Sequence, residues 1–293
     1  MSIQVRNIRY VYNEGLPDET VALDNVSFDL FDGEIVSVIG HTGSGKSTML
    51  QQLNGLLRPS EGTIVVEGTE ITRPTAVLRD VRRNVGLVFQ YPEYQLFEET
   101  IEKDVAFGPR NIGVPEDQIE DRVRRSLELV DLDFDEIRER SPFDLSGGQK
   151  RRAAIAGVLA MEPHVLVLDE PTAGLDPEAH GDIIAMIRRI HEERNGIIVF
   201  VSHNMMDVAL LSDRIIVMDR GRVITVDTPR NVFANRAILR SIGLDVPPAA
   251  AFLCALKERG AEVNTDVLTY DEAADEILKC FGYKEREGGE EQC

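Results

Sequence analysis

The segment Gly40-His-Thr-Gly-Ser-Gly-Lys-Ser-Thr48 constrains the fold of this chain more than any other part of the sequence. It matches the pattern GxxxxGK[ST], follows a short apolar run at 34–39 and precedes apolar residues at helical spacing. In such a strand–turn–helix unit, the backbone N–H groups of the turn and the positive end of the helix bind phosphate. We therefore predict that Lys46 bridges the β- and γ-phosphates of a nucleotide and that the Ser47 hydroxyl ligates Mg²⁺. The residues predicted to hold the nucleotide here are Gly40, His41, Thr42, Gly43, Ser44, Gly45, Lys46, Ser47 and Thr48.

Other short apolar runs predict a sheet of which this unit is one part. They lie at 3–12, 21–31, 63–66, 85–89, 165–168, 197–201 and 215–218. Helical stretches separate several of these runs, which indicates βαβ units, a largely parallel sheet and the α/β class. Residues from Pro115 to about Arg140 have the spacing of one charged amphipathic helix. Beyond about 230 the composition changes, so we expect a main domain over 1–230 and a small extension over 231–293 with a flexible acidic tail.

Charge and cysteine content exclude several function classes. Asp and Glu number 51 against 32 Lys and Arg, a net charge of −19, which disfavours a general nucleic-acid binder. The cysteines, Cys254, Cys280 and Cys293, are too few for a disulfide framework and fit a reducing cytoplasm. The longest apolar runs are far shorter than the roughly 20 residues needed to cross a bilayer. If the chain acts at a membrane, other subunits must therefore supply the membrane part.

Two adjacent carboxylates follow one of the predicted buried strands. The apolar run Val165-Leu-Val-Leu leads directly into Asp169 and Glu170. At such a strand end the first carboxylate can hold Mg²⁺, directly or through water, and the second can accept a proton from an attacking water. An isolated Asp-Glu pair is more often a solvated turn. Its position downstream of a phosphate loop favours the catalytic interpretation.

A second glycine-rich helix start occurs at Leu145, Ser146, Gly147, Gly148 and Gln149, ahead of a helical stretch that reaches Met161. A hydroxyl, two flexible residues and free N–H groups again suit an anion. One γ-phosphate has little room for two such loops from one chain. We therefore predict a head-to-tail dimer in which each chain offers this pentapeptide to the partner's nucleotide.

These motifs together resemble an ATP-binding cassette (ABC) ATPase over about residues 1–230. The resemblance implies a RecA-like core, an antiparallel β-subdomain and a helical subdomain at about 92–160. It also implies roles for residues outside the two loops. Tyr12 would stack on adenine, with Tyr10 as a rival, and Gln90 would sense Mg²⁺ and the γ-phosphate. Asp176 would make a contact across the dimer, and His203 would brace the γ-phosphate and the water. The implied Mg²⁺ ligands are Ser47, Gln90 and Asp169, and the implied catalytic residues are Glu170, His203, Gln90 and Lys46.

A narrower resemblance is to the ATPases of energy-coupling factor (ECF) importers, including the cobalt-transport lineage. It rests on the segments 90–100, 106–113 and 153–163. The Tyr-Pro-Glu that follows Gln90 and the run Gln149-Lys-Arg-Arg152 favour the second (A′-type) of the two paired ATPases. Such ATPases carry a small C-terminal α/β extension that helps them to dimerise, which residues 241–247 fit.

The narrower resemblance implies partners and a location. They are a second ABC ATPase, a membrane coupling subunit that docks near 91–100, and a membrane substrate-binding subunit for a vitamin or a transition-metal ion. The chain would work at the cytoplasmic face of the cell membrane, hydrolysing ATP with Mg²⁺ and without nucleic acid. Alternatively, a set of apolar side chains in this segment only caps the helical subdomain, namely Tyr91, Tyr94, Leu96 and Phe97.

Three other functions stay open from the sequence. The chain could serve another ABC importer with a regulatory C-terminal domain, or act outside transport, or bind nucleotide without catalysis. The short interval between Gln90 and Leu145 has no room for the long coiled coil of non-transport relatives.

Overall fold

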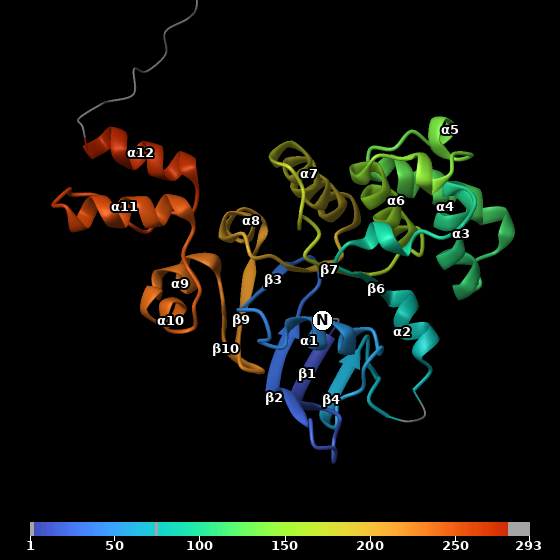
Figure 1. The fold of residues 1–293 in the computed structure, drawn as a ribbon, viewed down its shortest axis with the longest axis horizontal. Coiled ribbons are helices and arrows are strands. Elements are labelled where there is room, and N and C mark those ends of the chain that lie inside the picture. The colour runs from blue at the N-terminus through green and yellow to red at the C-terminus, as the bar shows by residue number, and fades with distance from the viewer. Residues whose placement is uncertain (1–2, 74–75, 281–293) are drawn as a thin grey trace, which may run out of the picture.

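The computed structural model describes residues 3–73 and 76–280, and it contains two β-sheets with helices around them (Figure 1). One sheet is antiparallel, in the order β2-β1-β4-β5. Its strands are β1 (Ile3–Tyr12), β2 (Thr20–Leu30), β4 (Glu61–Val66) and β5 (Thr69–Glu70). This sheet is the antiparallel β-subdomain that the family resemblance implies.

The second sheet is the core sheet, in the order β10-β9-β3-β8-β7-β6. Its strands are β3 (Ile35–Ile39), β6 (Val85–Val88), β7 (Val165–Asp169), β8 (Ile197–Val201), β9 (Arg214–Asp219) and β10 (Arg222–Asp227). All neighbours pair in parallel except β10, which runs antiparallel to β9. The strands at 165–168, 197–201 and 215–218 are thus confirmed, as is the α/β class.

Alternate residues of the core strands face two separate hydrophobic cores, as the two-residue period of a strand requires. Val165 and Val167 of β7 join the core that holds the antiparallel sheet, α1 (Lys46–Leu53) and α2 (Leu78–Asn84). Leu166 and Leu168 join the core on the opposite face, which holds α7 (Pro177–Arg194) and α8 (Met205–Leu211). Both faces of the core sheet are therefore covered, and the carboxyl ends of its strands stay free for a site.

Every element described between Pro92 and Leu159 is a helix. They are η1 (Pro92–Gln95), α3 (Ile101–Ile112), α4 (Glu116–Leu129), α5 (Phe134–Ile137), η2 (Pro142–Asp144) and α6 (Gly147–Leu159). The single helix predicted from Pro115 to about Arg140 is wrong, because α4 ends at Leu129. Asp131 has a left-handed φ of 56°, and Val130 and Leu132 turn into the core beside it.

The extension is helical in its described part and contains no strand there. The chain enters it through α9 (Pro229–Ala234). The helices that come next are α10 (Arg236–Ser241), α11 (Pro248–Glu258) and α12 (Tyr270–Cys280). Its expected α/β make-up is corrected on this point. The backbone groups between α11 and α12 bond to side chains instead of to a strand: Asn264 N donates to Glu276, and Arg236 donates to the Thr265 carbonyl. The acidic tail lies outside the described residues.

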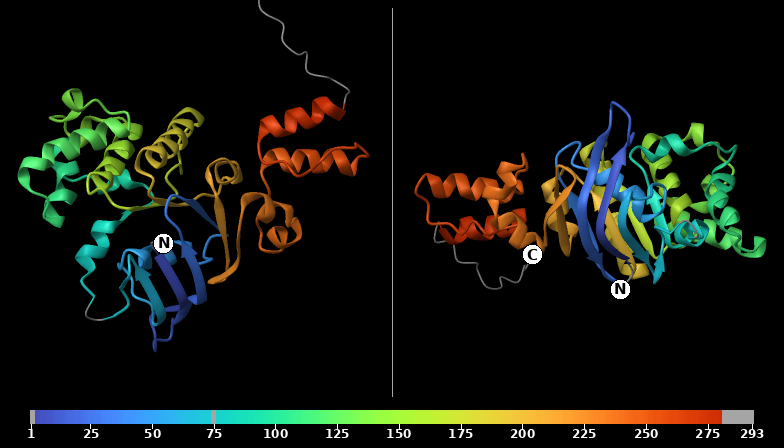
Figure 2. Two further views of the ribbon diagram at one scale, coloured as in Figure 1. Left: turned by 180° about the vertical axis from the view of Figure 1, so that it is seen from behind. Right: turned by 90° about the horizontal axis from the view of Figure 1, so that it is seen from below.

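The extension and the helical segment 92–159 lie at opposite ends of the molecule, with the sheets between them (Figure 2). None of the helices described between residues 3 and 280 is long and apolar enough to cross a membrane.

Candidate nucleotide site

The phosphate loop is tightly packed by its own chain between β3 and α1. Gly45 is the N-cap of α1 with φ 99°, and a Cβ atom there would lie 2.6 Å from the Ala22 carbonyl oxygen. A Cβ on Gly40 would lie 2.5 Å from the Met218 carbonyl oxygen. Only glycine fits both positions, so the loop conformation is fixed by sequence. Lys46 Nζ donates to the carbonyl oxygens of Gly40 at 2.7 Å and His41 at 3.1 Å.

Buried charges of opposite sign face each other beside this loop. Burial lowers the pKa of Lys46, against the opposing effect of Glu170 and Asp169. Burial also raises the pKa of Asp169 at the end of β7, partly offset by a hydrogen bond with Ser47. Both side chains are less than a tenth exposed. Oxygen donors of this kind, a hydroxyl beside a buried carboxylate, suit Mg²⁺, which would also relieve the cost of the buried negative charge.

Glu170 is held between two other predicted catalytic residues. Gln90 Nε2 donates to Glu170 Oε2 at 2.8 Å, and His203 Nε2 lies 2.8 Å from Glu170 Oε1. The three side chains follow β7, β6 and β8, whose carboxyl ends lie at the same edge of the core sheet. Glu170 has a left-handed φ of 51°, a costly conformation for a glutamate. A carboxylate aimed by two partners is suited to orienting one water molecule.

Tyr12, and not Tyr10, lies against the phosphate loop. The Tyr12 hydroxyl is 3.2 Å from Thr48 Oγ1, and its ring is partly exposed. Tyr10 packs against the core shared with the antiparallel sheet and meets the Tyr12 ring edge-on at 4.8 Å. The exposed face of Tyr12 is therefore the one suited to stack on a base.

His41 of the loop contacts Asp219 at the end of β9, with Nε2 and Oδ1 2.8 Å apart.

The second glycine-rich loop is arranged differently. Ser146 caps α6 in a capping box: its Oγ accepts from Gln149 N at 3.3 Å, and its own N–H donates to Gln149 Oε1 at 3.1 Å. Gly147 and Gly148 have open space where a Cβ would stand. Leu145 is buried and anchors the loop. In the described part of the chain, the hydrogen bonds of Ser146 and Gln149 stay within this loop and do not reach the phosphate loop.

Asp176 caps α7 by accepting hydrogen bonds from the backbone of Glu178 at 3.1 Å and Ala179 at 3.0 Å. It is exposed. This position leaves it accessible to another chain.

Sequence reasoning missed a buried ion pair that joins three parts of the site. Arg151 of α6 is 2% exposed and binds both carboxylate oxygens of Glu93, at 2.8 and 3.1 Å. The same guanidinium donates to the carbonyls of Pro171 at 3.1 Å and Ala173 at 2.8 Å, just after Glu170. Burial disfavours ionised Glu93, but the hydrogen bond and charge of Arg151 bring its pKa below the usual value. A Glu–Arg match across 58 residues has no local sequence signal, so it could not have been found from spacing.

Aromatic side chains gather on the surface of the segment 91–100. Tyr94 is 84% exposed and Phe97 58% exposed, and Phe107 of α3 meets the Phe97 ring edge-on at 4.9 Å. Leu96, in contrast, packs against the core. Exposed aromatic rings this close together are typical of a protein contact surface.

Comparison with known proteins places this geometry in a family. The ABC transporter family profile matches residues 23–173. The chain is 52% identical to the energy-coupling factor transporter ATP-binding protein EcfA2 of Caldanaerobacter subterraneus, over 95% of this chain and 97% of that protein. EcfA2 of Clostridioides difficile is also 52% identical, with the same coverage.

Solved structures agree with these relatives. CbiO1 of Clostridium perfringens, described as part of the ABC transporter complex CbiONQ, superposes with a TM-score of 0.72 at 37% identity, covering 86% of this chain and 98% of that one. The cassette MJ0796, in a dimer bound to ADP and Pi, superposes with a TM-score of 0.68 at 28% identity, covering 77% and 98%. The chain therefore belongs to the ABC transporter family and, within it, to the A′-type ATP-binding proteins of energy-coupling factor transporters.

Proposed function

We propose that this chain is the ATP-hydrolysing motor subunit of an ECF-type membrane importer for a vitamin or a transition-metal ion. The observation that carries the catalytic part is the Glu170 carboxylate held by Gln90 and His203 at 2.8 Å each, beside the Asp169–Ser47 pair. The ABC transporter family profile, which spans the phosphate loop and Glu170 within residues 23–173, supports this assignment. The A′-type relatives supply the assignment to ECF transporters.

Each residue of the site then has a chemical task. Lys46 binds the β- and γ-phosphates, while the backbone of 40–48 holds the rest of the phosphate chain. Glu170 accepts the proton of the attacking water, and His203 and Gln90 fix its carboxylate. Tyr12 stacks on the adenine. Ser47, Asp169 and Gln90 would hold Mg²⁺, which supplies charge neutralisation at the transferring phosphoryl group.

We further propose that the catalytic site is completed by a second ATPase chain. The open glycines of 145–149 have no atom of their own chain within 4 Å of a Cβ position and would bind the partner's γ-phosphate, with Asp176 contacting the partner nearby. Association of the two ATPase chains would then depend on bound ATP. In this proposal the main domain covers residues 1–230 and contains the helical subdomain at 92–160. The helices after residue 230 form an extension that would stabilise the dimer.

The exposed aromatic side chains of 91–100 are the proposed docking surface for the membrane coupling subunit. Arg151 connects this surface to the carbonyls just after Glu170. Movement of the docking surface and of the catalytic loop would therefore be linked. The chain would lie on the cytoplasmic face of the membrane, next to the coupling subunit and a substrate-binding membrane subunit.

The catalytic assignment is tested by Glu170→Gln in the complex purified from native cells. We expect phosphate release to fall at least 100-fold while ATP-dependent association of the two ATPases persists. Glu192→Gln, an exposed change on α7, is the matched control and should retain full activity. Full activity of Glu170→Gln would show that Glu170 is not the general base.

The ECF assignment is tested by mild-detergent purification of this chain, with mass spectrometry of its partners. A second similar ATPase with a small membrane subunit is the expected result. Recovery of a different permease with a soluble binding protein would instead favour another ABC importer, the second candidate that the sequence left open. Soluble partners alone would contradict transport.

A further inference from the structure

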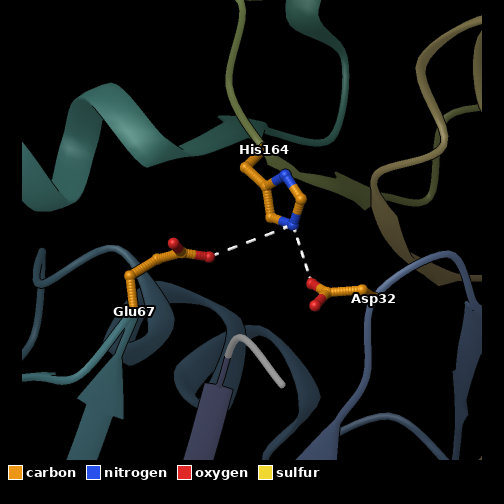
Figure 3. Close-up of side chains that lie close together, drawn as sticks. All are labelled: Asp32, Glu67 and His164. Atoms are coloured by element: carbon orange, nitrogen blue, oxygen red, sulfur yellow. Dashed lines mark hydrogen bonds and ion pairs between the residues drawn. The ribbon is translucent and has the colours of Figure 1, made fainter.

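Three side chains suited to metal binding meet at the edge of the core sheet opposite the nucleotide site (Figure 3). They are Asp32, between β2 and β3; Glu67, in the turn between β4 and β5; and His164, just before β7. His164 Nε2 lies 2.8 Å from Asp32 Oδ1 and 3.9 Å from Glu67 Oε1. One ligand atom from each residue lies within 4.8 Å of the others. Residues up to 132 positions apart thus converge on one point.

The backbone at each of the three positions is fixed. The His164 carbonyl accepts from Ile197 N at 3.0 Å, which ties it to β8. Glu67 and Gly68 form a two-residue hairpin turn, both with left-handed φ, between the paired residues Val66 and Thr69. Next to Asp32, the Gly33 carbonyl is 3.0 Å from His191 Nε2. The ligand-bearing positions are therefore held in place before any ion binds, which lowers the entropy lost on binding.

The chemistry of the three groups selects a class of ion. An imidazole nitrogen with two carboxylates is a ligand set for Zn²⁺ and similar divalent transition metals, whereas Mg²⁺ prefers oxygen alone. Metal–ligand bonds of about 2.0–2.2 Å place ligand atoms roughly 3–3.5 Å apart. The observed separations of 2.8 and 3.9 Å straddle this range. The three side chains are about half exposed, so Glu67 has room to move slightly towards His164. Water can fill the remaining coordination positions of the ion.

We propose that Asp32, Glu67 and His164 form a binding site for a divalent transition-metal ion such as Zn²⁺. The two carboxylates and a neutral imidazole carry a charge of −2, which the ion balances. The ion links the β4–β5 turn of the antiparallel sheet to the core sheet at β3 and β7. His164 precedes Asp169 by the five residues of β7, a backbone path of about 16 Å, so the site is separate from the nucleotide site. This inference does not depend on the proposed function.

The direct test is a calorimetric titration of the full chain with ZnCl₂, without nucleotide. His164→Gln keeps a hydrogen-bonding side chain opposite Asp32 but removes the imidazole. We expect the wild type to bind one more equivalent of Zn²⁺ than this variant. Zinc bound by other carboxylates or by the nucleotide site is common to both proteins and cancels. His180→Ala is the matched control, because His180 also pairs with one carboxylate at 2.8 Å, on Asp207, but has no second carboxylate partner among residues 3–73 and 76–280. It should bind as many equivalents as the wild type.

Glu67→Gln separates a metal site from a simple ion pair. If His164 and Asp32 only form an ion pair, this exposed change leaves zinc binding unaltered. If Glu67 is a ligand, we expect zinc affinity at this site to fall at least tenfold. Zinc at about 100 times the Kd of this site should also raise the Tm of the wild type by about 5 °C more than that of His164→Gln. Equal zinc stoichiometry, affinity and Tm shift in the wild type and in both variants would overturn the proposal.

Discussion

Two helices of this molecule begin at glycine-rich loops, and the two loops differ in how their own chain treats them. At the phosphate loop, Gly45 is pressed against the Ala22 carbonyl, and α1 starts without a side-chain cap. At the second loop, Ser146 and Gln149 cap α6, and Gly147 and Gly148 border open space. Both helix starts present N–H groups to an anion, but only the first is enclosed by the chain that carries it.

The difference indicates where each ligand comes from. A crowded loop keeps one backbone conformation whether or not a second chain is present, so it can bind nucleotide alone. An open helix start that is capped by its own side chains is stable without a ligand. Its surface stays free for a ligand that another molecule holds. Substitutions in the first loop should therefore affect folding and nucleotide binding, and substitutions in the second should affect hydrolysis alone.

The largest effect is expected from Gly148→Asp in the open loop. A carboxylate there would face the partner's γ-phosphate, so hydrolysis by the dimer should fall about 1,000-fold. ATP binding by the isolated chain and its Tm should stay the same, because a new side chain meets open space. Phosphate release and fluorescent-nucleotide binding measure the two separately.

Gly181→Asp on α7 is the control for this change. It adds the same charge, also in open space, and should alter hydrolysis less than twofold. If Gly148→Asp weakened ATP binding by the isolated chain, the second loop would act within its own chain and the contrast between the loops would fail.

The next largest effect is expected from the ion pair between Arg151, on the helix that the open loop begins, and Glu93. Arg151→Met leaves Glu93 as an unpaired carboxylate in a mostly buried position, which should lower the free energy of unfolding by about 3 kcal/mol. The double variant Arg151→Met/Glu93→Gln should recover much of this loss, because it removes the unpaired charge. Chemical denaturation of the wild type, Arg151→Met, Glu93→Gln and the double variant gives the coupling energy.

The acid dependence of the same pair has a definite sign. Arg151 brings the pKa of Glu93 below its usual value of 4.5, so this stabilisation is complete above that pH and is lost on acidification. Arg151→Met should therefore be less sensitive to acid than the wild type. Equal sensitivity would mean that the pair contributes little.

The sequence predicted the parts of this site whose signal is local. The strand–turn–helix at 34–53, the carboxylates after 165–168 and the histidine after 197–201 each follow an apolar strand, and the parallel topology then brings them together. Tyr12 could be separated from Tyr10 only through the contact with Thr48. Local chemistry and topology together thus sufficed to predict which of these residues the fold brings to one edge of the core sheet.

What the sequence did not predict depends on contacts between distant residues. The Arg151–Glu93 pair and the Asp32–Glu67–His164 cluster join side chains that no periodicity relates. The break after α4 follows from Val130 and Leu132 being drawn into the core, against the helical pattern around them. The helical make-up of the extension depends on side chains that bond to its connecting backbone.

A smaller effect is expected from Gly45→Ala in the crowded loop, where the new Cβ meets backbone and the φ of 99° is strained. We expect a loss of about 2–3 kcal/mol in unfolding free energy and weaker ATP binding. Gly43→Ala is the matched control, because its φ of 81° carries the same strain in open space. It should cost about 1 kcal/mol. Similar losses for both variants in thermal and denaturant unfolding would mean that backbone strain, and not crowding, distinguishes this loop.

The smallest expected effect is a gain. Burial raises the pKa of Asp169, so its ionisation opposes folding at neutral pH, and this cost disappears as the pH falls towards the usual value of 3.8. Asp169→Asn should raise the Tm at pH 7 by about 2–4 °C, the shift that about 1 kcal/mol produces, and the gain should shrink on acidification. Asp176→Asn removes the charge of an exposed cap and should give no gain. Thermal unfolding of both variants without nucleotide or Mg²⁺ decides the point. A lower Tm for Asp169→Asn at pH 7 would mean that the Ser47 hydrogen bond and the Lys46 charge outweigh the burial of Asp169. The charges beside the enclosed loop would then stabilise the fold instead of destabilising it.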